Sequence, residues 1–193
     1  MAREAIIAGN NQKLRTLIPA KVKINFIDKY SDSTLLITAV DNQQVEIVRF
    51  LLENKADPNP KGLMRTPLTV AISKNNYEIF DLLLASKADV NLAGTFGYGP
   101  LHSAVHNEDG RFIDRLLALG ANPNIMTPRK QTPLLEWPNG YAAQRLIDAG
   151  ADVNLANSDG DTPLMNAAGG TPDAVRALLA AGANVNAKNR NGD

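Results

Sequence analysis

Short apolar segments at helical spacing alternate along this chain with polar stretches that contain glycine and proline. In residues 45–54, VEIVRFLLEN, the apolar residues recur at the spacing of one helix face. An apolar doublet closes each segment of this kind. The doublet stands at 51–52, 83–84, 116–117, 146–147 and 178–179. The pattern therefore predicts short helices that repeat along the whole chain.

Two further strings keep the same period. Strings of the type ADVN stand at 56–59, 88–91, 121–124, 151–154 and 183–186, and their final asparagines are 32, 33, 30 and 32 residues apart. Strings of the type DTPLMNA stand at 33–39, 65–71, 98–104, 131–137 and 161–167. Three signals with one period indicate an array of repeated units.

These strings resemble those of the ankyrin repeat family, whose unit has about 33 residues and carries a Thr-Pro-Leu-His-x-Ala string. The resemblance covers nearly the whole chain and implies an all-α fold, an ankyrin repeat solenoid of stacked helix-turn-helix units with projecting hairpin-like loops. We interpret 1–193 as a single ankyrin repeat domain. Its expected units are an N-terminal remnant at about 1–25, then 26–59, 60–91, 92–124, 125–154 and 155–186, with 187–193 starting a further unit.

The recurring letters predict where the helices begin and end. A threonine hydroxyl can cap a helix, and proline suits the first helical position because its missing N–H has no helical acceptor. These predicted pairs are Thr66-Pro67, Thr132-Pro133, Thr162-Pro163 and Thr171-Pro172. Gly120, Gly150 and Gly182 are expected to end the second helix of their units in a left-handed conformation.

Two departures from the pattern predict local irregularities. Lys21, Lys55 and Lys87 stand where later units have the helix-ending glycine. Left-handed geometry costs a non-glycine residue about 1–2 kcal/mol, so these helix ends should be less stable or differently shaped. In the short unit 125–154, Pro138 follows Trp137, and we expect the first helix to end early there.

Two histidines raise the question of a metal site. His102 and His106 are four residues apart, which is a spacing that could bind zinc on a helix. However, the resemblance implies a structural role for His102, whose ring would bond loop backbone and brace neighbouring loops. Glu108 and Asp109 fall in the predicted turn, and no third ligand has a suitable spacing. We therefore predict neither a metal nor a cofactor.

Large apolar and basic side chains occupy the loops that the resemblance projects from the stack. Aromatic residues, methionine and arginine are enriched in the cores of protein interfaces, so these loops are candidates for partner binding. Helix-end residues could extend the site across the concave face. The candidate residues are Tyr30, Leu63, Met64, Arg65, Phe96, Tyr98, His106, Ile125, Met126, Arg129 and Trp137. The alternatives are that single loop side chains fold against neighbouring loops and that Trp137 fills the space left by the shortened helix.

The composition of the chain excludes several classes of function. Twenty basic residues balance twenty acidic ones, so the net charge gives no drive toward nucleic acid. No apolar run approaches the roughly 20 residues that span a bilayer, and we expect no membrane insertion. There is no cysteine, and no serine, histidine and aspartate set suggests a catalytic site.

We therefore expect a non-enzymatic, monomeric protein–protein interaction module. It would bind another protein, or another domain of the same chain, through its loop tips and concave helix face. The alternative is a regulatory or targeting segment of a larger enzyme or secreted effector. We expect a bacterial source, a natural chain that continues past Asp193, and a cytoplasmic location, with periplasmic or host-secreted location as alternatives.

Overall fold

A computed structural model describes residues 1–18, 23–107, 110–170 and 172–193. The predictions for Lys21, for Glu108 and Asp109, and for the Thr171 cap lie outside the described residues. The chain divides into two compact units, Met1–Thr95 and Phe96–Asp193.

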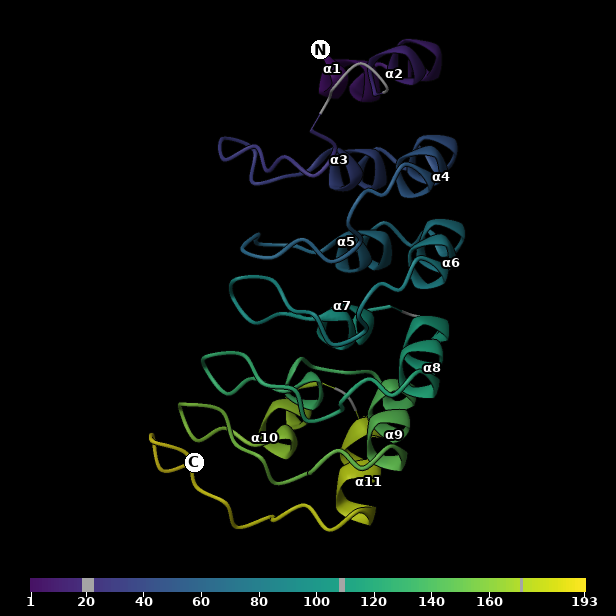
Figure 1. The fold of residues 1–193 in the computed structure, drawn as a ribbon. Coiled ribbons are helices and arrows are strands. Elements are labelled where there is room, and N and C mark those ends of the chain that lie inside the picture. The colour runs from purple at the N-terminus through teal and green to yellow at the C-terminus, as the bar shows by residue number, and fades with distance from the viewer. Residues whose placement is uncertain (19–22, 108–109, 171) are drawn as a thin grey trace. The chain divides into compact units, whose positions relative to one another are not determined.

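The first unit is built from successive helix pairs. Within a pair, α1 packs on α2, α3 on α4 and α5 on α6, while between pairs α1 packs on α3, α3 on α5 and α4 on α6. The loops that precede α3 and α5 project to one side (Figure 1). The helices are α1 (Ala2–Ile7), α2 (Asn11–Leu17), α3 (Leu35–Asp41), α4 (Val45–Glu53), α5 (Pro67–Ser73) and α6 (Tyr77–Ala85).

The second unit repeats this plan. Its elements are α7 (Pro100–Ala104), α8 (Arg111–Ala118), the 3-10 helix η1 (Pro133–Leu135), α9 (Gly140–Asp148), α10 (Pro163–Ala168) and α11 (Pro172–Ala180). Successive second helices pack together, α8 on α9 and α9 on α11, and α10 packs on η1. In the described residues the only strand-like feature is an isolated bridge between Asp28 and Ser33. The predicted all-α fold of stacked helix pairs with projecting loops is confirmed.

The predicted helix starts hold in the regular repeats. The Thr66 hydroxyl accepts a hydrogen bond from Thr69 N at 3.2 Å, and the Thr162 hydroxyl accepts one from Met165 N at 3.4 Å. The cap predicted at Thr132 is wrong, because η1 is only three residues long and the buried Thr132 hydroxyl has no partner within the described chain. Proline nevertheless occupies the start of all three helices.

The second helices α4, α6, α8, α9 and α11 each end in a left-handed residue. Gly120, Gly150 and Gly182 have φ values of 80°, 88° and 85°. Lys55 and Lys87 both have φ 66°, so the expectation of a different shape at these ends is wrong. The lysines adopt the left-handed backbone that glycine has in the other units, and they pay the conformational cost of that backbone for a residue with a side chain.

An asparagine joins four of these helix ends, those at Lys55, Lys87, Gly150 and Gly182, to the preceding repeat. The Asn59 side chain accepts from Asp89 N at 2.7 Å and donates to Lys87 O at 2.9 Å. Asn124 makes the same two bonds to Asp152 N and Gly150 O, at 2.8 and 3.0 Å. Equivalent bonds join Asn25 to Lys55 O and Asp57 N, and Asn154 to Gly182 O and Asn184 N. This asparagine is the last residue of the ADVN-type string, or its counterpart Asn25 in the remnant.

The short unit 125–154 is irregular in the predicted place. Its first helix is reduced to η1, and Trp137 has φ 57° just before Pro138. The Leu135 carbonyl, which a longer helix would use, accepts from Gln131 Nε2 at 3.1 Å and from Asn166 Nδ2 at 2.8 Å. A side chain of the next repeat therefore supplies a hydrogen bond that the shortened helix cannot make for itself.

Removing one asparagine should loosen two repeats at once. We expect Asn124→Ala to lower the free energy of unfolding by about 1–2 kcal/mol, because two backbone groups lose their partner. Asn186 is the matched control, since it ends the last ADVN-type string and its side chain makes no bond to another repeat in the described chain. Asn186→Ala should cost less than about 0.5 kcal/mol in the same urea titration. Equal losses in the two variants would contradict the bridging role.

Restoring glycine to a lysine helix end should stabilise the chain. Glycine at position 87 removes a left-handed cost of about 1–2 kcal/mol and adds roughly 0.5–1 kcal/mol of unfolded-chain entropy. We therefore expect Lys87→Gly to raise the free energy of unfolding by about 0.5–1 kcal/mol. Lys61→Gly removes the same charge from a residue outside the left-handed region and should not stabilise. A gain in both variants would attribute the effect to charge rather than to backbone geometry.

Candidate functional site

The loops of the first unit are hairpin-like and bonded to one another. Asp28 and Ser33 exchange backbone hydrogen bonds of 2.9 and 3.3 Å. The next loop attaches through Met64 N, which donates to Asp32 Oδ2 at 2.6 Å. Thr95 N in turn donates to Leu63 O at 2.9 Å. The tips of these loops are therefore held side by side, although they are about thirty residues apart in sequence.

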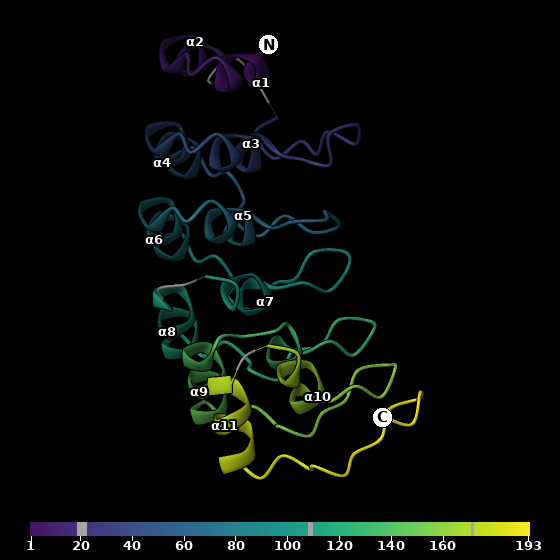
Figure 2. The ribbon, with the colours of Figure 1, turned by 180° about the vertical axis from the view of Figure 1, so that it is seen from behind.

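The loops of the second unit follow the same rule. Thr127 N donates to Gln131 O, and Asn157 N to Asp161 O, each at 3.0 Å. Ser158 N donates to Arg129 O at 2.9 Å and so joins these two loops. Figures 1 and 2 show the loops of this unit projecting to a common side.

A close approach fixes the position of the 96–98 loop against its neighbour. Gly97 has φ 82°, and a methyl group added to it would lie 2.6 Å from Pro128 Cδ and 2.7 Å from Thr127 Cα. Only glycine fits this contact. Phe96 and Tyr98 are therefore placed beside the loop that begins with Ile125 and Met126.

These loops form a surface that we call the second-unit loop surface, defined by Phe96, Tyr98, Met126, Arg129 and Lys130. The side chains of Phe96, Tyr98 and Met126 are 60%, 46% and 42% exposed, and both basic residues are exposed. Ile125, another candidate from the sequence, is half-buried. Aromatic side chains exposed in a group are typical of binding sites.

The first unit presents a smaller loop surface. Tyr30 is fully exposed and Met64 is 53% exposed. Arg65 is exposed too, but it lies 3.6 Å from Asp41, which also contacts Lys74 at 3.3 Å. Leu63 is only 2% exposed, so its assignment to the partner-binding surface is corrected. Its side chain is buried within the unit while its neighbour Met64 points outward.

His102 has the structural role that the resemblance implied. It is 1% exposed, its Nδ1 accepts from Gly99 N at 3.3 Å, and its Nε2 donates to Gln131 O at 3.0 Å. The ring thus joins the start of α7 to the neighbouring loop and must be neutral to accept at Nδ1. Burial lowers the pKa of His102 below its ordinary value, and the bond to Gln131 partly opposes this.

A second cluster gathers around the broken helix of the second unit. His106 Nε2 lies 3.6 Å from Glu136 Oε2, and Trp137 follows with 56% of its surface exposed. Burial raises the pKa of Glu136, whose Oε1 has no partner in the described residues, and His106 opposes the shift. The sequence pattern indicated His106 and Trp137 but not Glu136, because a single acid directly after a helix carries no periodic signal.

Trp137 is only partly packed. A methyl group added to Gly169 would lie 3.1 Å from its Cζ3, so the indole lies along the end of α10. Its exposed part leaves it available at the surface. The indole therefore packs against the end of α10 with one part of its surface, and it fills only part of the space left by the shortened helix.

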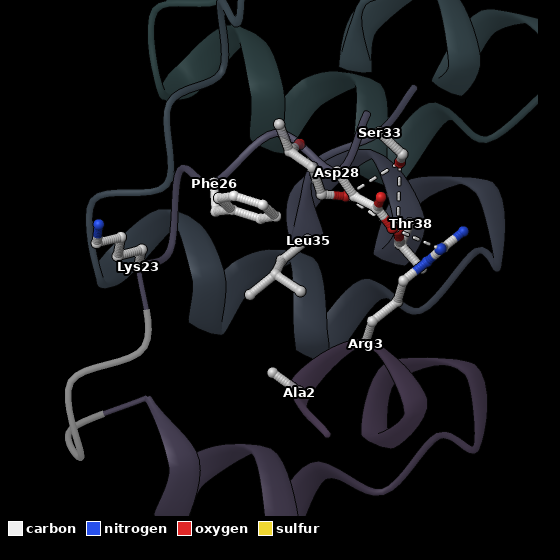
Figure 3. A pocket seen from close by; sticks show the side chains of 9 residues that line it. Ala2, Arg3, Lys23, Phe26, Asp28, Ser33, Leu35 and Thr38 are labelled. Carbon is white, nitrogen blue, oxygen red and sulfur yellow. Dashed lines mark hydrogen bonds and ion pairs between the residues drawn. The ribbon is translucent and has the colours of Figure 1, made fainter. Parts of the chain in front are cut away.

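A cavity of about 290 Å³ lies in the first unit, between α1 and the start of α3 (Figure 3). Its lining residues are Ala2, Arg3, Lys23, Phe26, Asp28, Ser33, Thr34, Leu35 and Thr38. In Figure 3, Phe26, Leu35 and Ala2 border its apolar part, and Arg3 is paired with Asp28 at 2.9 Å. This cavity could not be predicted from the sequence, because α1 and the loop at 23–28 are outside the regular repeat strings.

The described ranges hold neither a metal-ion cluster nor a membrane-spanning helix. Those residues contain no group of three or more histidine, aspartate or glutamate side chains placed to hold a metal ion. Their helices are also too short or too polar for one to cross a bilayer.

The chain belongs to the ankyrin repeat family. The family description "Ankyrin repeats (3 copies)" matches residues 3–93 and again 99–189. Two ankyrin repeat proteins of fowlpox virus are similar in sequence. One is 25% identical over 84% of this chain and 89% of its own length. The other is 33% identical over 68% of this chain, and only 42% of its own length is covered.

Solved structures share the fold. An ankyrin repeat domain from Acinetobacter baumannii has a TM-score of 0.81 and 28% identity over 95% of this chain and 98% of its own. The human ASB11 ankyrin repeat domain has a TM-score of 0.77 and 28% identity over 100% of this chain and 88% of its own. The ankyrin repeat domain of Bcl-3 has a TM-score of 0.81 at 24% identity, covering 100% of this chain and 90% of its own. Ankyrin repeats are generally protein–protein interaction modules and are typically non-catalytic.

The neutral His102 predicts a pH dependence of stability. Because its pKa is lower in the folded chain, the unfolded chain takes up a proton first as the pH falls below about 6.5. The His102 contribution to stability is complete above that pH and is lost progressively below it. We expect the free energy of unfolding to decrease between pH 7 and pH 5, measured by urea denaturation at each pH. His102→Gln should flatten this decrease while lowering stability throughout. His106→Gln, the control, should retain it, and loss of the slope in that variant instead would reassign the effect.

Proposed function

We propose that this chain is a protein-interaction module that binds its partner chiefly through the second-unit loop surface. The observation that carries the proposal is the exposure of Phe96, Tyr98 and Met126 on loops that are bonded to their neighbours. Buried packing does not account for these side chains. They supply the apolar anchors that dominate binding energy at protein interfaces.

The rigidity of the loops supports the same function. The loop at 127–131 is held by both of its neighbours, because Arg129 O accepts a hydrogen bond from the next loop and Gln131 O accepts one from His102. A partner that docks on a preformed surface loses less conformational entropy in ordering it. This argues for recognition by a fixed surface rather than by a segment that folds on binding.

The cluster at the broken helix could extend the site. Trp137 and His106 are both exposed, and the shortened η1 removes part of a helix that a regular repeat would have. We assign them to the rim of the interaction surface of the second unit. Tyr30, Met64 and Arg65 form the corresponding candidates in the first unit.

A second proposed function is regulation or targeting of a larger polypeptide. One observation favours it: the chain covers only 42% of one viral relative, so the matched repeats are part of a longer protein in that case. The partner would then be a domain of the same polypeptide. The sequence of the gene on either side of these residues distinguishes the two functions.

Exposed loop side chains can be removed without damaging the fold. We expect Phe96→Ser/Met126→Ser to weaken binding about tenfold or more, while the melting temperature changes by less than about 2 °C, since both side chains are exposed. The ligands would be short peptides selected from a random displayed library on the immobilised chain. Affinities would be measured by fluorescence anisotropy.

A matched variant controls for the loss of exposed apolar surface. Leu119 and Leu179 are 52% and 45% exposed at the ends of α8 and α11, away from the loops. Leu119→Ser/Leu179→Ser should leave peptide affinity unchanged. The proposal fails if the two double variants lose the same affinity, or if Phe96→Ser/Met126→Ser unfolds the chain while binding per folded molecule is retained.

A further inference from the structure

We infer that the second-unit loop surface recognises an acidic segment of its partner, in which carboxylates alternate with large apolar side chains. This inference rests on the proposed function and adds the chemistry of the partner. It is carried by the charges around Phe96 and Met126 and by the way the loop at 127–131 is fixed.

The charge on this surface is positive and is not neutralised by its own loops. Arg129 and Lys130 are exposed, and neither side chain forms an ion pair or a hydrogen bond within the part of the chain that the structure describes. The loop residues 94–99 and 125–131 include no aspartate or glutamate. Two cations therefore stand beside exposed apolar side chains without a counter-charge on their own loops.

The nearest acidic loop is engaged elsewhere. Residues 156–161 follow next in the stack and carry Asp159 and Asp161. Asp159 lies 3.8 Å from Arg190, in the loop beyond. Asp161 accepts from Asn157 Nδ2 at 3.2 Å and from Asn189 Nδ2 at 2.9 Å. Asp159 is thus paired with the loop beyond and Asp161 is bonded to asparagine amides, and neither carboxylate forms an ion pair with Arg129 or Lys130 in the described chain.

The backbone that bears the two cations is held in one conformation. Lys130 N donates to Thr127 O at 2.8 Å, and Lys130 has φ 57°. Gln131 N donates to the Thr127 hydroxyl at 3.1 Å. His102 and Ser158 then brace this turn from either side. Fixed positive groups beside apolar anchors favour a segment of complementary charge, which also speeds association.

Aromatic and basic residues together could also bind single-stranded nucleic acid, in which bases stack on aromatic rings. Three observations favour an acidic peptide. The surface has only two unpaired cations, whereas a nucleic-acid backbone needs a continuous basic groove. The chain as a whole has no net charge. Tyr98 also contacts the His102 ring in a T-shaped arrangement at a centroid distance of 5.5 Å, so part of its ring is used within the chain itself.

The test uses defined probes and the full 193-residue chain. The probe is a fluorescein-labelled peptide that alternates glutamate and aspartate with phenylalanine and leucine. Its two controls replace the acids with glutamine and asparagine, or with lysine. We expect the acidic peptide to bind at least about tenfold more tightly than the amide peptide at low salt, and to lose this advantage as salt rises.

A charge-matched pair of variants locates the effect. Arg129→Gln/Lys130→Asn removes both cations, and asparagine tolerates the left-handed backbone at position 130. Lys13→Gln/Arg176→Gln removes the same charge from exposed residues of α2 and α11. Only the first variant should abolish the preference for the acidic peptide, while its unfolding curve stays close to that of the parent chain.

The outcomes separate the inference from the proposed function. Equal binding of the acidic and amide peptides, or equal losses in the two charge variants, overturns the acidic partner. Salt-sensitive binding of a single-stranded oligonucleotide that depends on Arg129 and Lys130, without the peptide preference, overturns it too. Neutral peptides that depend on Phe96 and Met126 would leave the interaction function standing without the acidic partner. If no peptide of any charge depends on these two residues, both proposals fall.

Discussion

One asparagine carboxamide between successive repeats is the interaction on which the rest of this structure depends. The end of a helix leaves backbone carbonyls without a partner, and the turn after it leaves an N–H group. Asn59 and Asn124 satisfy both groups of the next repeat with one side chain, since an amide carries a donor and an acceptor in one plane. Aspartate lacks the donor, and glutamine places the amide one carbon farther away. The spacing between repeats is therefore set by polar geometry as well as by apolar packing.

The positions of the loops depend on these asparagine hydrogen bonds. Each ADVN-type string leads directly into a loop, so fixing the asparagine fixes the point from which the loop projects. Loop-to-loop bonds such as Ser158 N to Arg129 O and Thr95 N to Leu63 O then align the tips within each unit. Side chains about thirty residues apart in sequence become neighbours because each loop is bonded to the next one along the chain. A surface made in this way changes its chemistry by single substitutions in loops while the helices stay the same.

The sequence predicted those features whose cause is local. Thr66 and Pro67 begin a helix because of what they bond within one turn, and Gly120 ends one because of its own backbone freedom. Features that depend on a contact with a residue about thirty positions away could not be predicted from the sequence. Asn59 was visible only as a repeated letter, and its two partners lie in the next repeat. Leu63 and Met64 are adjacent apolar loop residues, but Leu63 is buried and Met64 is exposed. An irregular loop has no hydrophobic period that would predict this difference.

The broken helix shows how a repeat tolerates a failure of its own pattern. Pro138 ends the first helix of its unit early, and the hydroxyl of Thr132 loses its role as a cap. The carbonyl left behind at Leu135 accepts from Gln131 and Asn166, so the neighbouring repeat supplies what the helix lacks. Trp137 is held in a left-handed conformation, which costs a bulky residue about 1–2 kcal/mol. That conformation is kept although more than half of the indole is exposed, so burial alone does not account for it. The strained residue directly follows Glu136, which pairs with His106, so the conformational cost is carried where the broken helix leaves an aromatic and a charged side chain at the surface.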